Sequence, residues 1–260
     1  MIEMNGKQRL RWLLGLSLIG WLWLGGLAWA APAQNTLLAY VGAGLKDPAG
    51  ELATLYESKT GVRVELILNS SGALLSQLEL SKKGDIYLPG GMPFVMMAKQ
   101  KGYIGEMVGP LAYHFPVIIV PKGNPAHIAK VEDLARPGVQ LILPDKDSTA
   151  LGKSALKIFA NLNLSAPILK NVKAYVETGP KVPLTIALGQ GDAGIAEYSD
   201  ASKNRALELV AIDPAVNVVD EIPCAVLTCS AQREAALTFL QFVKENGAAV
   251  FAKHGFKTKL

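Results

Sequence analysis

The chain has few of the residues that build metal centres and nucleophile–histidine active sites. It contains two cysteines and three histidines among 260 residues. The histidines, His114, His127 and His254, lie far apart in the sequence and lack metal-ligand spacing. No Gly-x-Ser-x-Gly elbow is present, and no histidine lies near a plausible triad. These absences argue against a histidine metal centre and a serine hydrolase, and we expect a protein that is not an enzyme.

The two cysteines, Cys224 and Cys229, could form a disulfide in an oxidising compartment. Residues 225–227 between them are strand-like, and side chains five residues apart on a strand point to opposite faces. We therefore expect two free, buried cysteines.

Lysine and arginine form no basic run in the chain. The 26 basic and 22 acidic residues give a net charge of +4. Residues 1–30 hold three of the basic residues and one acid, so without them 23 − 21 leaves +2. A charge so close to neutral argues against nucleic acid as a partner.

A long apolar run occurs only at the N-terminus. Three basic residues precede apolar residues 12–27, and a small-x-small cleavage site follows at residues 28–30. This pattern predicts a cleaved signal peptide at residues 1–30 and a periplasmic location. Because spanning helices start near about 17 residues, an uncleaved membrane anchor is the alternative. No cysteine follows the cleavage site, so a lipid anchor is not expected, and residues 31–260 allow one large domain or two lobes.

Strand-like and helix-like segments alternate along the rest of the chain, which predicts an α/β fold of mainly parallel sheets flanked by helices. Ligands of such sheets bind beyond the carboxyl ends of the strands, where we expect the turns at residues 42–44 and 70–72 to meet in one site. Pro223 places the last strand at an edge or at a crossing between lobes. The expected strands cover residues 36–41, 61–68, 84–88, 115–121, 139–143, 172–177, 192–195 and 218–228.

The serine turn Ser70-Ser71-Gly72-Ala73 joins a strand to an amphipathic helix. The first turn of a helix has N–H groups without internal partners and a partial positive charge, and serine adds a hydroxyl donor. The turn is therefore either an ordinary N-cap or a small neutral anion cradle. Further helix starts of this kind follow the polar turns at residues 144–152 and 178–183, with Ser148 or Thr149 as the expected cap of the first.

An ordered set of motifs runs through the mature chain. Gly-Ala-Gly-Leu-Lys, Ser-Ser-Gly-Ala-Leu, Gly-Asp-Ile, Val-Pro-Lys-Gly-Asn-Pro, Gly-Asp-Ala-Gly-Ile and Pro-Cys-Ala-Val-Leu precede a C-terminal helix. From Leu37 to about Phe251 the chain thereby resembles the periplasmic molybdate- and tungstate-binding proteins of ABC importers.

This resemblance implies a two-lobed type II periplasmic-binding fold with an oxyanion in the cleft. Lobe 1 would hold residues 35–113 and 202–260, and lobe 2 residues 114–201. The hinge strands would lie near residues 113–120, 195–201 and 221–228. The protein would be a monomer and would need no cofactor. It would deliver molybdate or tungstate to a membrane permease.

The resemblance also assigns the ligand to hydroxyls and helix-start amides rather than lysines. Such neutral donors suit molybdate and tungstate, which at neutral pH only accept hydrogen bonds. The matching positions are Ser70, Ser71, Ala150, Leu151 and Gly179.

Two positions depart from the family pattern. Gly44 stands where serine or threonine is usual, so only its amide can contribute. Glu197, followed by Tyr198, stands where bacterial members often have tyrosine, and a carboxylate beside a dianion costs energy unless it shares a proton, turns away or binds the metal. In archaeal members with Glu-Tyr here, carboxylates complete an octahedral metal centre, and Asp147 or Asp145 would then be the second carboxylate. The alternative is that Glu197 is a hinge salt-bridge residue.

Three other functions remain open from the sequence. A receptor of the same fold could bind sulfate, chromate or an organic carboxylate, and the missing hydroxyl at Gly44 keeps this possible. An exported hydrolase using Ser71 and an interaction protein with a vestigial cleft are the others.

Overall fold

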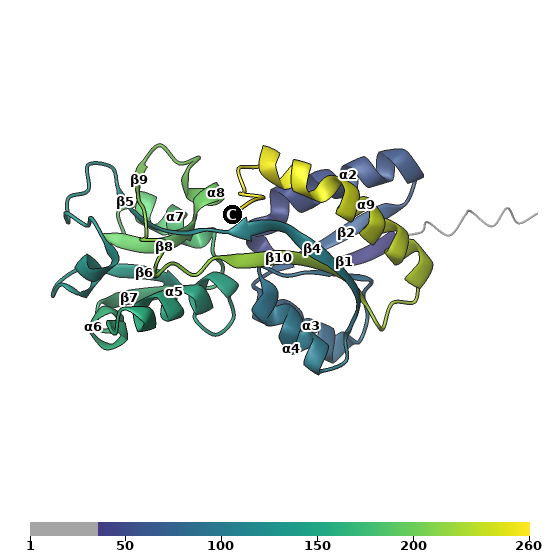
Figure 1. Cartoon of the computed structure of the whole chain (residues 1–260), viewed down its shortest axis with the longest axis horizontal. Coiled ribbons are helices and arrows are strands. Elements are labelled where there is room, and N and C mark those ends of the chain that lie inside the picture. The colour runs from purple at the N-terminus through teal and green to yellow at the C-terminus, as the bar shows by residue number, and fades with distance from the viewer. Residues whose placement is uncertain (1–35) are drawn as a thin grey trace, which may run out of the picture. The chain divides into compact units, whose positions relative to one another are not determined.

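The computed structural model describes residues 36–260, so the predicted signal peptide lies outside the described residues. They form two five-stranded sheets, ordered β2-β1-β3-β10-β4 and β7-β6-β8-β5-β9, each with helices on both faces (Figure 1). This arrangement confirms the predicted α/β class. Within the described residues, no helix combines the length and the apolar character that a membrane crossing needs.

The first sheet has a parallel half and an antiparallel half. Strands β1 (Thr36–Gly42), β2 (Arg63–Asn69) and β3 (Ile86–Leu88) are parallel, whereas β10 (Asp220–Leu227) runs antiparallel to both β3 and β4 (Ile104–His114). The carboxyl ends of the three parallel strands therefore share one edge, as predicted from the order of the segments.

Alternation of side chains along β1 separates the two layers of this sheet. Leu37 and Val41 face the side covered by α2 (Lys46–Thr60) and α9 (Arg233–Lys253), while Tyr40 faces α3 (Ser71–Ser81) and α4 (Met92–Gln100). Both sides are apolar, so the sheet is buried between two helical layers.

The second sheet is built in the same way. Strands β6 (Leu141–Pro144), β7 (Val172–Val176) and β8 (Ala193–Glu197) are parallel, and β5 (Pro116–Pro121) pairs antiparallel with β8 and with β9 (Leu207–Val210).

One face of the second sheet packs against a 3-10 turn and two helices, η2 (Val131–Ala135), α5 (Ala150–Asn161) and α6 (Ser165–Lys170). The other face packs against α7 (Lys181–Ala187) and α8 (Tyr198–Ala201). Helices therefore cover both faces, as they do in the first sheet.

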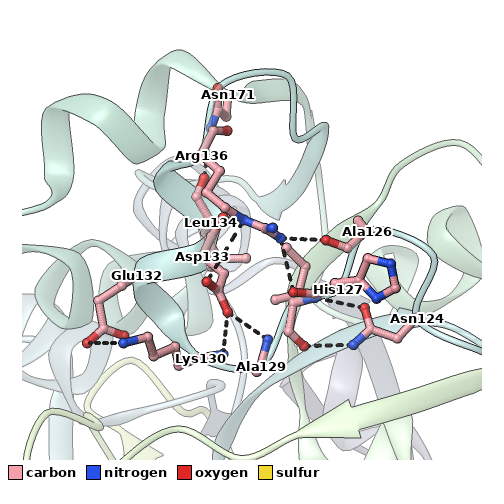
Figure 2. A network of polar contacts seen from close by, with 11 residues as sticks. Asn124, Ala126, His127, Ala129, Lys130, Glu132, Asp133, Leu134, Arg136 and Asn171 are labelled. Carbon is pink, nitrogen blue, oxygen red and sulfur yellow. Dashed lines mark hydrogen bonds and ion pairs between the residues drawn. The ribbon is translucent and has the colours of Figure 1, made fainter.

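A polar network shapes the loop before η2 (Figure 2). Asp133 accepts hydrogen bonds from the N–H groups of Ala129 (2.8 Å) and Lys130 (3.1 Å), and Arg136 donates to the carbonyls of Ala126 and His127. These bonds all join residues of one surface loop. This loop contains His127 and lies away from the junction of the sheets.

The chain crosses between the sheets twice, from β4 to β5 and from β9 to β10. The predicted boundary at residue 202 is wrong, because β9 pairs with β5 in the second sheet. The predicted hinge at residues 195–201 is also wrong, since β8 and α8 both pack in the second sheet, and the later crossing precedes β10 rather than lying at residues 221–228.

Two smaller predictions concern β10. Pro223 lies in a strand that is paired on both sides, not at an edge. The pairing with β4 has a register irregularity between Ile222 and Cys224, so no ladder hydrogen bond is required from Pro223, which lacks an N–H. Cys224 and Cys229 are both free, as predicted, although only Cys224 is fully buried. Burial raises the pKa of the Cys224 thiol to about 12.

Candidate functional site

A small cavity of about 50 Å³ lies where the two sheets face each other. Its wall is built mainly from four segments that each begin a helical element: residues 42–45 at η1 (Ala43–Leu45), 69–71 at α3, 149–151 at α5 and 178–180 at α7. The first two belong to the first sheet and the last two to the second. The wall is completed by Gly90, His114, Glu197 and Asp200.

The helix starts in the wall present N–H groups that the helices cannot use. Ser71 opens α3, and Ala150 and Leu151 open α5; no acceptor within residues 36–260 takes their N–H groups. Thr149 is the N-cap of α5, as expected, and its hydroxyl accepts from the N–H of Gly152 at 2.9 Å. Ser70 occupies the N-cap of α3 but its hydroxyl caps nothing, so it remains available to a ligand.

Ser71 is the most enclosed hydroxyl in the wall, with 3% of its surface exposed. Its Oγ accepts a hydrogen bond from the N–H of Gly90 at 2.9 Å. A hydroxyl that accepts in this way keeps its own proton for a second partner. Ser71 is therefore held in place as a donor toward the cavity.

Direct backbone contact joins the two halves of the protein beside the cavity. The N–H of Gly72 donates to the carbonyl of Ser148 at 2.8 Å and so joins the start of α3 to the turn before α5. A Cβ atom on Gly72 would lie 2.8 Å from the Cα of Ser148, closer than real Cβ contacts allow. Glycine is thus required for the two halves to meet here.

A buried ion pair forms the hinge-side wall. Glu197, at the end of β8, has one carboxylate oxygen 2.7 Å from Nδ1 of His114 and accepts the N–H of Phe115 on the other at 3.2 Å. Burial alone would lower the pKa of His114, but the charge of Glu197 and its hydrogen bond outweigh that effect and raise the pKa. The alternative that Glu197 is a salt-bridge residue is thus supported, although its own segment is not a hinge and only its partner His114 lies at a crossing between the sheets.

Two further acids adjoin this pair. Asp200 on α8 lines the cavity, and burial together with the charge of Glu197 raises its pKa to about 6. Asp220 lies opposite His114 in the β10–β4 pairing; its Oδ1 accepts the N–H of Met92 at 3.3 Å, its Oδ2 is buried without a partner, and burial raises its pKa.

The structure brings together seven of the eight sequence-predicted ligand positions. The cavity wall contains Gly44, Ser70, Ser71, Ala150, Leu151, Gly179 and Glu197.

Three predicted positions lie elsewhere. Tyr198 is exposed beside Phe115 and Lys257 in a separate groove. Asp147 is exposed, pairs with Lys146 at 2.7 Å and lines another groove, while Asp145 accepts the N–H groups of its own turn. Asp147 and Glu197 therefore do not share a cavity, and no cluster of three metal-ligating side chains occurs within residues 36–260.

The sequence did not point to His114 or Asp200. The one available signal for His114 was its position directly before the apolar strand at residues 115–121, at the predicted lobe junction. Nothing in the sequence pointed to Asp200 as a site residue except its nearness to Glu197 along the chain.

Two helix-covered sheets joined by two crossings, with a small donor-lined cavity between them, define a two-lobed binding protein. Over residues 37–257 the chain matches the bacterial extracellular solute-binding proteins, and it belongs to that family.

Individual relatives differ in what their names say they bind. A Haemophilus influenzae protein named only as a binding protein is 26% identical over 221 residues, covering 85% of this chain and 90% of its own. The molybdate-binding protein ModA of Mycobacterium tuberculosis is 23% identical over 232 residues, covering 87% of each chain. The solved sulfate-binding protein SubI of the same organism is similar in fold, with a TM-score of 0.75, 19% identity and coverage of 85% and 86%. These relatives are binding proteins, not enzymes.

Proposed function

We propose that the protein is a periplasmic receptor that captures molybdate or tungstate in the cavity between its two sheets and delivers it to the permease of an ABC importer. The observation that carries this proposal is the convergence on one cavity of the N-termini of α3 and α5, together with the turns at η1 and before α7. Helix starts favour anions through their free N–H groups and their partial positive charge.

The size and chemistry of the cavity favour an inorganic oxyanion. Its volume of about 50 Å³ is well below the ~300–1,000 Å³ of pockets for drug-sized organic ligands. No lysine or arginine is among the residues that line it, so its donors are hydroxyls, amides and His114. Fully ionised molybdate and tungstate only accept hydrogen bonds, which suits such a wall.

We further propose that the anion is bound as an intact tetrahedron. Both oxygens of Glu197 already have partners in His114 and Phe115, and Asp147 lies in a different groove. Glu197 then serves to orient His114 rather than to ligate the metal atom of the anion.

A panel of oxyanions tests the proposal. Thermal unfolding of the mature chain is measured with molybdate, tungstate, sulfate, chromate and phosphate. A ligand at 100 times its Kd increases the free energy of unfolding by about 2.7 kcal/mol. Molybdate and tungstate are expected to raise the Tm most. Absence of a shift with both would refute the proposal.

Sulfate is the second candidate. It is favoured by Gly44, which supplies no hydroxyl to the cavity, and by the similarity in fold to SubI. Competition calorimetry separates the two, since a sulfate receptor would bind sulfate more tightly than molybdate.

A further inference from the structure

Asp200 presents an acceptor in a wall where a bound oxyanion needs donors. It is partly buried at the cavity, and the space beside Gly44 is filled by its Oδ2, which lies 3.6 Å from where a Cβ would stand. Within residues 36–260 no hydrogen bond or salt bridge holds its carboxylate, and His114 and Lys203 act on it only through their charges. An ionised Asp200 would repel an entering dianion, since like charges in a partly desolvated site oppose each other.

The charged groups around Asp200 come from each element packed against it. Glu197 on β8 and Asp47 on α2 are negative and favour a proton on Asp200, whereas His114 on β4 and Lys203 after α8 oppose it. Burial is the largest effect, and together these influences raise the pKa of Asp200 to about 6. At neutral pH and without a bound anion, Asp200 is therefore ionised but close to taking up a proton.

Building on the proposed function, we propose that Asp200 takes up one proton from solvent with each anion that enters the cavity, and that its neutral carboxyl then donates an O–H to the anion. The protonated group replaces a repulsion with a hydrogen bond. Asp200 thus becomes a ligand of the anion and the residue that makes its capture depend on pH.

Calorimetry across pH tests the proposal. Molybdate and sulfate are titrated into the mature protein between pH 6.0 and 8.5, in pairs of buffers with different ionisation enthalpies. The wild type is expected to take up one proton per anion at pH 7.5, and its Kd is expected to rise about tenfold per pH unit above pH 7.

The Asp200→Asn variant carries a permanently neutral donor of similar shape. Its proton uptake and pH dependence are expected to vanish, and at pH 8 it is expected to bind about 100-fold more tightly than the wild type, because two pH units separate that pH from the pKa of Asp200. Asp213→Asn, an exposed change of the same type outside the cavity, is the matched control and is expected to keep the wild-type slope.

Two results would overturn the role of Asp200. One is anion binding without proton uptake in the wild type. The other is an Asp200→Asn variant that binds both anions more weakly than the wild type at every pH, since a neutral donor at this position would then not favour the anion. Proton-linked binding of sulfate without any binding of molybdate or tungstate would instead reject the molybdate receptor and retain the role of Asp200.

Discussion

Replacement of Ser71 by alanine is the sharpest perturbation of the cavity. Ser71 is 3% exposed at the start of α3, and its Oγ is fixed by the N–H of Gly90. A hydrogen bond to a charged partner contributes about 1.5–3 kcal/mol. Because about 1.4 kcal/mol is a tenfold change in Kd, Ser71→Ala is expected to weaken molybdate binding about 10- to 150-fold.

The same change has a second, separable effect. It leaves the N–H of Gly90 without its acceptor, which costs roughly 1–3 kcal/mol of folding free energy if water does not replace it. Urea unfolding of the ligand-free variant measures that loss, and calorimetry with molybdate measures the affinity. Ser76→Ala, an exposed change on the same helix, is the control and is expected to alter neither quantity. An unchanged Kd in Ser71→Ala would show that this hydroxyl does not bind the anion and would refute the site.

Three further predictions follow from the geometry. Glu197→Gln removes the anionic partner of His114, so we expect the pKa of His114 to fall in NMR titration, while X-ray absorption shows an unchanged coordination number at molybdenum; a lower number would mean that Glu197 is a metal ligand. The ligand-free protein should become less stable to urea between pH 6 and 8, because the raised pKa of His114 stabilises the fold below its unfolded value of about 6.5 and this contribution is lost as pH rises through the folded pKa; a flat profile would contradict the raised pKa of His114. The raised pKa of Asp200 lowers stability at more acidic pH, as pH rises between its ordinary value of 3.8 and about 6, and this effect is nearly complete above that range. Thr149→Ala removes the N-cap of α5 and is expected to lower the free energy of unfolding by about 1 kcal/mol, against no change for Thr149→Ser.

The donor half of the site could be predicted from the sequence because it is local. Ser71 and Ala150 each begin a helix after a strand, and Gly179 lies in the turn between β7 and α7; the order of strands brings such turns to one edge of a sheet. Hydrophobic spacing and turn residues are sufficient to find these positions.

The charged half could not be predicted because it depends on contacts between distant segments. His114 meets Glu197 across 83 residues, and it does so at the end of β4, a strand whose glycines, Pro110 and weak alternation left it unrecognised. Tyr198 lies outside the cavity because β8 ends at Glu197, which is buried, and the chain turns there into α8, whose first residue Tyr198 is exposed.

The same limit explains the misplaced lobe boundary. β9 is four residues long, and only its pairing with β5, almost ninety residues earlier, shows that it belongs to the second sheet. A segment so short carries too little periodicity to be assigned by pattern alone.

The backbone of Gly72 can approach Ser148 this closely only because glycine has no side chain. Even the Cβ of an alanine at position 72 would collide with Ser148 and hold the two halves apart, and larger side chains would increase that separation. A graded series at this single position would therefore give a set of receptors with progressively wider resting openings, and a fluorophore across the gap would turn them into calibrated anion sensors.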